Sequence, residues 1–233
     1  VYPIAYALVP KLTEMLTLGK DGRGLITSSI KTTSVISLPC AVGLGVLSLP
    51  ILDLIFPKNS ALLASPMLTM LAPSVFFCAV LGITNSILQA SGNEKLPIIS
   101  MIAGVLVKFL SSYILIGIDG IGRFGIPAGT CLCYLTAITL NFTFMCRKTK
   151  TVPNMLQVFV KPALCAALCG VAAYTVNGIM PNTSFSVLVP ILTAVLVYAL
   201  SIFKSGTIDA DDIIQLPKGE KLCTILKRIK FIK

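Results

Sequence analysis

Long runs of apolar residues, separated by short polar gaps, dominate the pattern of this chain. Six of the runs are long enough to cross a bilayer, because a spanning helix needs about 20 residues. We place them at Thr32–Phe56, Ala61–Ala90, Pro97–Ile118, Phe124–Cys146, Val158–Met180 and Phe185–Phe203. A further run at residues 1–10 is too short to cross and reads as a partial first span. The pattern predicts an all-α integral membrane protein, with a multi-span helical bundle over residues 1–203.

The composition agrees with this prediction. Of the 233 residues, 55% are hydrophobic and 12% are charged, whereas soluble domains are about 25% charged. A soluble fold of this size cannot cover so much apolar surface with polar groups, but a bilayer makes that cover unnecessary. Eight cysteines occur without any histidine, so we interpret the cysteines as packing residues rather than as zinc ligands, and we expect no cofactor.

The basic residues are distributed unevenly between alternate gaps. If the crossings alternate, the gaps 11–31, 91–96, 147–157 and 204–233 face one side, and they hold 15 of the 19 Lys and Arg residues. The opposite gaps hold only Lys58 and Arg123. The positive-inside rule therefore predicts a cytoplasmic C-terminus. The same rule accounts for the net charge of +10, because the basic residues orient the chain in the membrane. We therefore expect no nucleic-acid partner.

Residues 204–233 form a basic tail that the pattern predicts to be cytoplasmic. Within the tail, Leu222, Ile225, Leu226 and Ile229 recur at the spacing of one helix face. Such a short amphipathic helix is suited to lie on the anionic inner leaflet. A solvated helix packed on the bundle is the alternative, and the tail sequence does not separate the two.

Few polar groups lie within the spans, and Lys108 is the outlier among them. It falls near the middle of its span, where an unpaired charge costs roughly 3 kcal/mol or more. A lysine at this depth either faces a wet cavity that attracts an anionic substrate, or snorkels and bonds to carbonyls. Asn85, Gln89 and Asn141 are candidate cavity residues or interhelical hydrogen-bonding residues. Asp53, near the outer end of its span, is a candidate ion site or an exposed helix end.

Prolines lie within or beside several spans, where each removes a backbone hydrogen bond and permits a kink. Ordinary membrane packing explains such prolines, and so do bent helices that rock during transport. The seven are Pro39, Pro50, Pro66, Pro73, Pro127, Pro162 and Pro190.

Enzymatic sites are poorly supported by the sequence. Metal-dependent hydrolysis generally needs histidine ligands, an aspartyl dyad needs two buried acids, and only Asp53 lies within a span. The sequence has neither a Gly-x-Ser-x-Gly elbow nor a Walker phosphate-binding loop. These absences argue against an enzyme.

Several short strings, in order along the chain, carry a family resemblance. They are Ala7–Glu14, Asn85–Gly92 followed by Lys95–Pro97, Lys108 followed by Tyr113–Ile116, Gly120–Gly122 followed by Gly125–Thr130, and Leu216–Leu222. With these strings the chain resembles the C-terminal half of the polysaccharide-exporter and stage V sporulation protein B branch of the multidrug/oligosaccharidyl-lipid/polysaccharide flippase superfamily. Ser112 stands where that branch usually has Asn, and Thr13 where it often has Ser.

The resemblance implies the second half of a two-bundle transporter that works by alternating access. Its implied partners are a lipid-linked saccharide on a polyprenyl pyrophosphate, membrane lipids and the missing N-terminal half. The implied task is to flip a lipid-linked oligosaccharide or peptidoglycan precursor across the bacterial cytoplasmic membrane, for cell-wall, polysaccharide or spore cortex synthesis. The residues expected to line the substrate cavity are Lys108, Tyr113, Asn85, Gln89 and Asn141.

Three other functions remain open at this point. A cation-coupled drug antiporter of the same superfamily predicts buried acids, of which Asp53 is the only candidate. A membrane-embedded glycosyl polymerase needs a large outer loop, and the outer gaps are short. A non-transporting assembly protein would leave Lys108 without a cavity.

Overall fold

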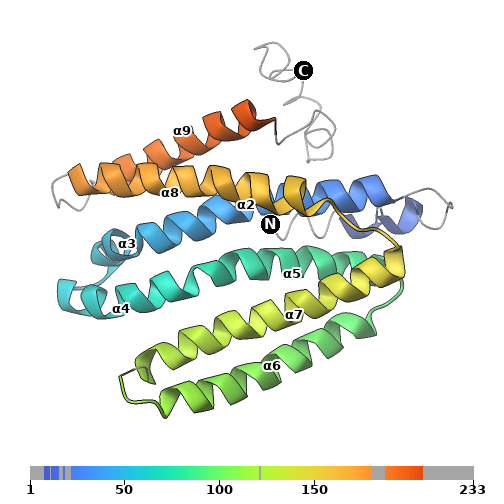
Figure 1. Ribbon diagram of the computed structural model, residues 1–233, viewed down its shortest axis with the longest axis horizontal. Coiled ribbons are helices and arrows are strands. Elements are labelled where there is room, and N and C mark those ends of the chain that lie inside the picture. Colours follow the sequence, from blue (N-terminus) through green and yellow to red (C-terminus); the bar gives the residue numbers. More distant parts are fainter. Residues whose placement is uncertain are drawn as a thin grey trace.

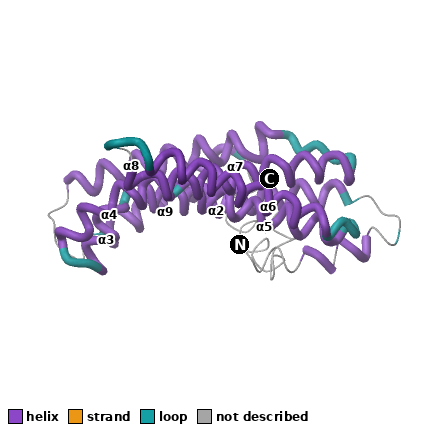
Figure 2. Tube along the Cα trace, turned by 90° about the horizontal axis from the view of Figure 1, so that it is seen from below, coloured by secondary structure: helices purple, strands orange, loops and turns teal. Residues whose placement is uncertain are grey.

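The computed structural model describes residues 8–10, 12–15, 18, 22–120, 122–179 and 187–206. Regular structure in these ranges is helical throughout (Figure 2), which confirms the predicted all-α class. The α-helices are α2 (Arg23–Val46), α3 (Ser48–Ile55), α4 (Lys58–Leu71), α5 (Pro73–Ala90), α6 (Lys95–Ile116), α7 (Gly125–Thr149), α8 (Lys161–Ile179) and α9 (Leu188–Ser205). A 3-10 turn, Gly122–Phe124, precedes α7, and a π-helical turn, Leu156–Val160, precedes α8.

Six helical segments of the described chain are long and apolar enough to cross a membrane. They are Arg23–Val46, Lys58–Ala90, Lys95–Ile116, Gly122–Thr149, Leu156–Ile179 and Leu188–Ser205. Each one overlaps one of the six runs found in the sequence. The second segment contains both α4 and α5, which meet at Ala72.

The long helices lie side by side in the order α6, α7, α5, α2, α8, α9 (Figure 1). This order differs from the chain order, because α7 packs between α5 and α6, and α2 packs between α5 and α8. Within its most hydrophobic stretch, α2 at the centre of the row has 44% of its residues buried, whereas α6 at one edge has 11%. The row therefore leaves broad apolar faces for lipid or for further protein to cover.

The main hydrophobic core lies where α2, α5 and α7 meet. Its fully buried members include Ile30 from α2, Ile83 and Ile87 from α5, and Met145 from α7. The ring of Phe159 caps this core, with its centroid 5.9 Å from that of Phe76 and 6.2 Å from that of Phe142. The Phe159 side chain thus links the π-helical turn to α5 and α7, while the turn itself packs on α2.

The first complete span begins earlier than the sequence indicated. We expected Thr32–Phe56, but α2 begins at Arg23 and ends at Val46, and the shorter α3 follows it. The earlier start falls in the Ser- and Thr-rich stretch 27–37, of which we assigned residues 27–31 to a loop because of their polarity. Its hydroxyls bond instead to carbonyls one turn back, as from Ser34 to Ile30 (2.9 Å) and from Ser37 to Thr33 (2.8 Å).

Lys31 consequently lies inside α2 and not in the basic loop to which we assigned it. Its side chain is 8% exposed. Of the other cations in that loop, Arg23 begins α2, whereas Lys11 and Lys20 lie outside the described residues. The predicted amphipathic helix of the tail and residues 1–7 of the partial first span also lie outside them.

Most of the span prolines occupy the first turn of a helix, where an N–H group has no intrahelical acceptor. This holds for Pro50, Pro73, Pro127, Pro162 and Pro190. Only Pro39 in α2 and Pro66 in α4 are interior. Two of the first-turn prolines, Pro50 and Pro73, coincide with breaks inside the apolar runs predicted as single spans.

Candidate substrate-binding face

An amide pair joins α5 to α7 near the end of the bundle that carries Lys95. The Asn141 side-chain amide on α7 donates a hydrogen bond from Nδ2 to Oδ1 of Asn85 on α5. Asn141 is completely buried, and its own Oδ1 has no hydrogen-bond partner among the described residues. Asn85 is half-buried. The structure thus brings together two of the candidate cavity residues, with one acceptor atom left unsatisfied.

A groove of about 560 Å³ runs between α5 and α6 beside this pair. The two helices follow each other in the chain but make few contacts, because α7 packs between them. Asn85 and the exposed Gln89 supply its polar wall. Its other lining residues come from α6 and are Pro97, Ile98, Met101, Ile102, Val105 and Leu106. We call this hollow the α5–α6 groove.

Lys108 lies on α6 beyond the lining residues of the groove. It is seven residues after Met101, so the two share a helix face about 10 Å apart. Its backbone packs closely on α7, because a Cβ atom placed on Gly129 would lie 3.3 Å from the Lys108 carbonyl oxygen. The Lys108 side chain is half-buried. Lys108 therefore lies at the border between the α6–α7 contact and the exposed side of α6 that lines the α5–α6 groove. We call this exposed side, together with the groove, the open face.

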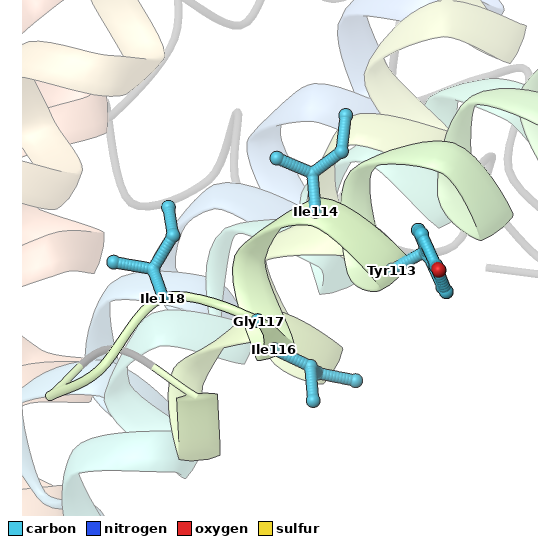
Figure 3. A pocket seen from close by; sticks show the side chains of 5 residues that line it. All are labelled: Tyr113, Ile114, Ile116, Gly117 and Ile118. Atoms are coloured by element: carbon cyan, nitrogen blue, oxygen red, sulfur yellow. The ribbon is translucent and has the colours of Figure 1, made fainter.

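Tyr113 lies on another part of α6. It is 85% exposed and lines a shallow hollow of about 460 Å³ with Ile114, Ile116, Gly117 and Ile118. Figure 3 shows these side chains pointing in different directions around the end of the helix. Five residues turn a helix by about 140°, so Tyr113 and Lys108 project to different sides. The structure does not bring Tyr113 together with the other candidates.

Asp53 is distant from this face. It is an exposed residue of α3, at the end of the bundle opposite to the Asn85–Asn141 pair. No cluster of three His, Cys, Asp or Glu residues with metal-binding geometry occurs in the part of the chain that the structure describes. The role of Asp53 as an ion site stays a prediction.

A polar surface in the first half of α2 was missed at the sequence level. Its buried members are Ser28, Ser29, Lys31, Thr33, Ser34 and Ser37. Thr33 is completely buried, and its hydroxyl lacks a hydrogen-bond partner among the described residues. The available signal was the dense run of Ser and Thr over 27–37. We assigned residues 27–31 to the basic loop and residues 32–37 to the first span, without considering them as one polar surface.

The chemistry available on the open face is that of hydrogen bonding and charge attraction. Amide groups of Asn85 and Gln89 both donate and accept hydrogen bonds, which suits hydroxyl and acetamido groups of a sugar. The ammonium of Lys108 attracts phosphate as a point charge. The aliphatic wall from α6 suits apolar ring faces or lipid chains.

Two comparisons with known proteins agree on the kind of molecule to which this face belongs. The sequence model of the family described as lipid II flippase MurJ matches residues 2–195. A solved structure described as lipid II flippase MurJ in an inward closed conformation superposes with a TM-score of 0.64 at 22% sequence identity. That match covers 85% of this chain and 41% of the solved chain. No curated protein sequence matches the chain.

Proposed function

Because the chain belongs to the lipid II flippase MurJ family, we propose that it forms part of a transporter that flips a lipid-linked cell-wall precursor across the bacterial cytoplasmic membrane. The family lies within the flippase superfamily expected from the sequence, although the matching model is not that of the polysaccharide-exporter and sporulation branch. It favours a peptidoglycan precursor over other lipid-linked saccharides. A role in spore cortex assembly stays a prediction of the sequence resemblance.

The observation that carries this proposal is the open face of α6, with Lys108 beside a groove that has an amide wall. The precursor combines a pyrophosphate with a saccharide, and its charges lose hydration in hydrocarbon. A cation on α6, about 10 Å along that helix from the groove residue Met101, and hydrogen-bonding amides on α5 match these two parts. We place the pyrophosphate near Lys108 and the saccharide near Asn85 and Gln89, with the lipid chain left in the bilayer.

The chain spans 41% of the length of the solved flippase, and its helices form an open row. A second set of helices facing the row would close a cavity around the polar headgroup. Rocking of one set against the other would then expose that cavity to each side in turn. In this mechanism Lys108 holds the headgroup by charge, and the α5–α6 groove selects the saccharide.

The test of the site is the variant Lys108→Ala in the native protein that carries this chain. We expect precursor binding and flipping to fall at least tenfold, since a charge-assisted contact contributes about 1.5–3 kcal/mol. Flipping is measured in vesicles loaded with fluorescent lipid II, and binding by titration in detergent. Lys108→Arg keeps the charge and should retain most of the activity.

Lys161→Ala is the matched control, because Lys161 is an exposed cation in the first turn of α8. It should leave both measurements unchanged. Normal flipping by a Lys108→Ala protein that reaches the membrane at the native level would remove the site. A native protein that moves cations or drugs, and no lipid-linked saccharide, would favour the antiporter instead.

A further inference from the structure

Two helix breaks lie side by side at the same level of the bundle. One separates α2 from α3 at Leu47, and the other separates α4 from α5 at Ala72. A Cβ atom placed on Gly45, just before the first break, would lie 3.3 Å from the Cβ of Ala72 in the second. The breaks are thus in contact, although 24 residues lie between Leu47 and Ala72 in the sequence.

Each break has a proline as its cause. Pro50 has no N–H to donate to the carbonyl of Val46, and Pro73 has none for the carbonyl of Thr69. The ring of each proline also crowds the carbonyl four residues earlier. In the second break, the Ala72 N–H bonds to the carbonyls of both Leu68 (2.9 Å) and Thr69 (3.3 Å), which tightens the last turn of α4.

A pair of hydroxyls connects the two breaks. The oxygens of Ser48 and Thr69 are 2.7 Å apart. The Thr69 oxygen also lies within bonding distance of the carbonyls of Gly45 (3.2 Å) and Ser65 (3.0 Å). One hydroxyl therefore donates to the other across the break. This contact links the start of α3 to the end of α4.

The segment between the breaks is a helical hairpin, Ser48–Leu71, that packs more closely within itself than on any one other helix. Figure 1 shows α3 turned out of line with α2, beyond the end of that helix. The apolar side chains of Ile55, Phe56 and Leu63 are each at least half exposed. The hairpin is thus held to the rest of the row mainly by the two breaks and by contacts of α4 with α2 and α7.

We propose that the hairpin Ser48–Leu71 moves as one body about the paired breaks at Leu47 and Ala72, and that this movement gates the end of the transport path opposite to the basic helix ends. Both connections of the hairpin lack a backbone hydrogen bond at the same level, because of Pro50 and Pro73, so the hairpin can swing without stretching either connection. The Ser48–Thr69 contact keeps the two breaks in step. The gating role rests on the proposed function, whereas the movement itself does not.

The movement is tested by double electron–electron resonance on the native protein in lipid nanodiscs. Spin labels carried by unnatural amino acids at Asn59 and Arg123, both exposed, leave the native cysteines in place. We expect two populations of label separation in the native protein. The double variant Pro50→Ala/Pro73→Ala restores the missing N–H groups and should give a single population. It should flip lipid II about tenfold more slowly, with unchanged lipid II binding.

Pro66→Ala is the matched control, because Pro66 is an exposed proline inside α4 and away from both breaks. It should keep both populations and the native flipping rate. A single population in the native protein, or two populations that persist in the double variant, would overturn the proposal. If the double variant does not fold, the two single variants are measured in its place, and each should reduce the minor population.

The two proposals fail in different ways. A native protein that flips no lipid-linked precursor would remove the proposed function, yet the label separations would still decide whether the hairpin moves. A protein in which Lys108→Ala abolishes flipping while the hairpin stays in one position would remove the hinge and leave the function intact.

Discussion

At the scale of single residues, glycines decide how closely α6 approaches α7. A Cβ atom on Gly104 would lie 2.8 Å from the Cys133 carbonyl oxygen and 3.3 Å from the Ala137 Cβ. Backbone cannot withdraw as a flexible side chain can, so even one methyl group pushes the helices apart. This close approach explains why small residues recur along both helices.

The variant Gly104→Ala is therefore expected to destabilise the protein by about 1–3 kcal/mol, the usual cost of overpacking. Gly43→Ala is its counterpart on α2, where a Cβ atom would meet nothing within 4 Å. Alanine favours the helix over glycine by about 1 kcal/mol, so this change should be neutral or stabilising. Thermal unfolding in detergent, followed by circular dichroism, measures both. Equal melting temperatures for the two variants would contradict the α6–α7 packing.

Two residues in the same sequence string do not necessarily lie on the same face of a helix. Lys108 and Tyr113 belong to one string of the family resemblance, yet they project to different sides of α6. Asn85 and Asn141 are 56 residues apart, and nothing local indicates that they meet. The sequence therefore supplied the polar candidates, whereas the pairing depended on how α5 packs on α7.

At the scale of elements, the amide pair makes an asymmetric contribution to the α5–α7 contact. Asn85→Leu would leave both polar atoms of the buried Asn141 amide without partners, which costs about 1–3 kcal/mol. Asn141→Leu removes the buried polar atoms themselves and leaves Asn85 facing the α5–α6 groove. The first variant should thus be clearly the less stable of the two.

The double variant Asn85→Leu/Asn141→Leu should recover most of the stability lost in Asn85→Leu alone. Losses in unfolding free energy add when the substituted residues are independent, but they do not add when the residues are in contact. Unfolding in a denaturing detergent gives the four free energies of the cycle. Additive losses would mean that the two side chains do not interact across the helices.

The existence of the spanning elements was predictable, because length and apolarity alone identify them. The boundaries of these elements were less predictable from the sequence. Ser and Thr hydroxyls that bond back to the helix carbonyls make the start of α2 polar without making it a loop. Pro50 and Pro73 were visible in the sequence as possible kinks, but their position at one level of the bundle depends on how α2 and α4 align.

At the scale of the whole molecule, the helices form an open row rather than a closed bundle. The order of helices in the row depends on contacts between distant segments, and the sequence carries no local signal for it. Burial falls from α2 at the centre to α6 at the edge. The exposed apolar faces therefore belong against lipid or against the other helices of a two-bundle transporter.

The same row makes the sidedness of the molecule testable. Arg23, Lys95, the 147–150 cluster, Lys161 and Lys204 lie at one set of helix ends, and Lys58 and Arg123 lie at the other. Because Lys and Arg are retained on the cytoplasmic side, the first set should be inside the cell.

Specific protease sites inserted beside Lys58, Arg123, Lys150 and Lys204, one per variant, provide the measurement in intact spheroplasts. The sites beside Lys58 and Arg123 should be cut by added protease, and the other two only after the membrane is opened. Cleavage at Lys58 and Lys150 from the same side would place an even number of crossings between them, which the three segments Lys58–Ala90, Lys95–Ile116 and Gly122–Thr149 exclude.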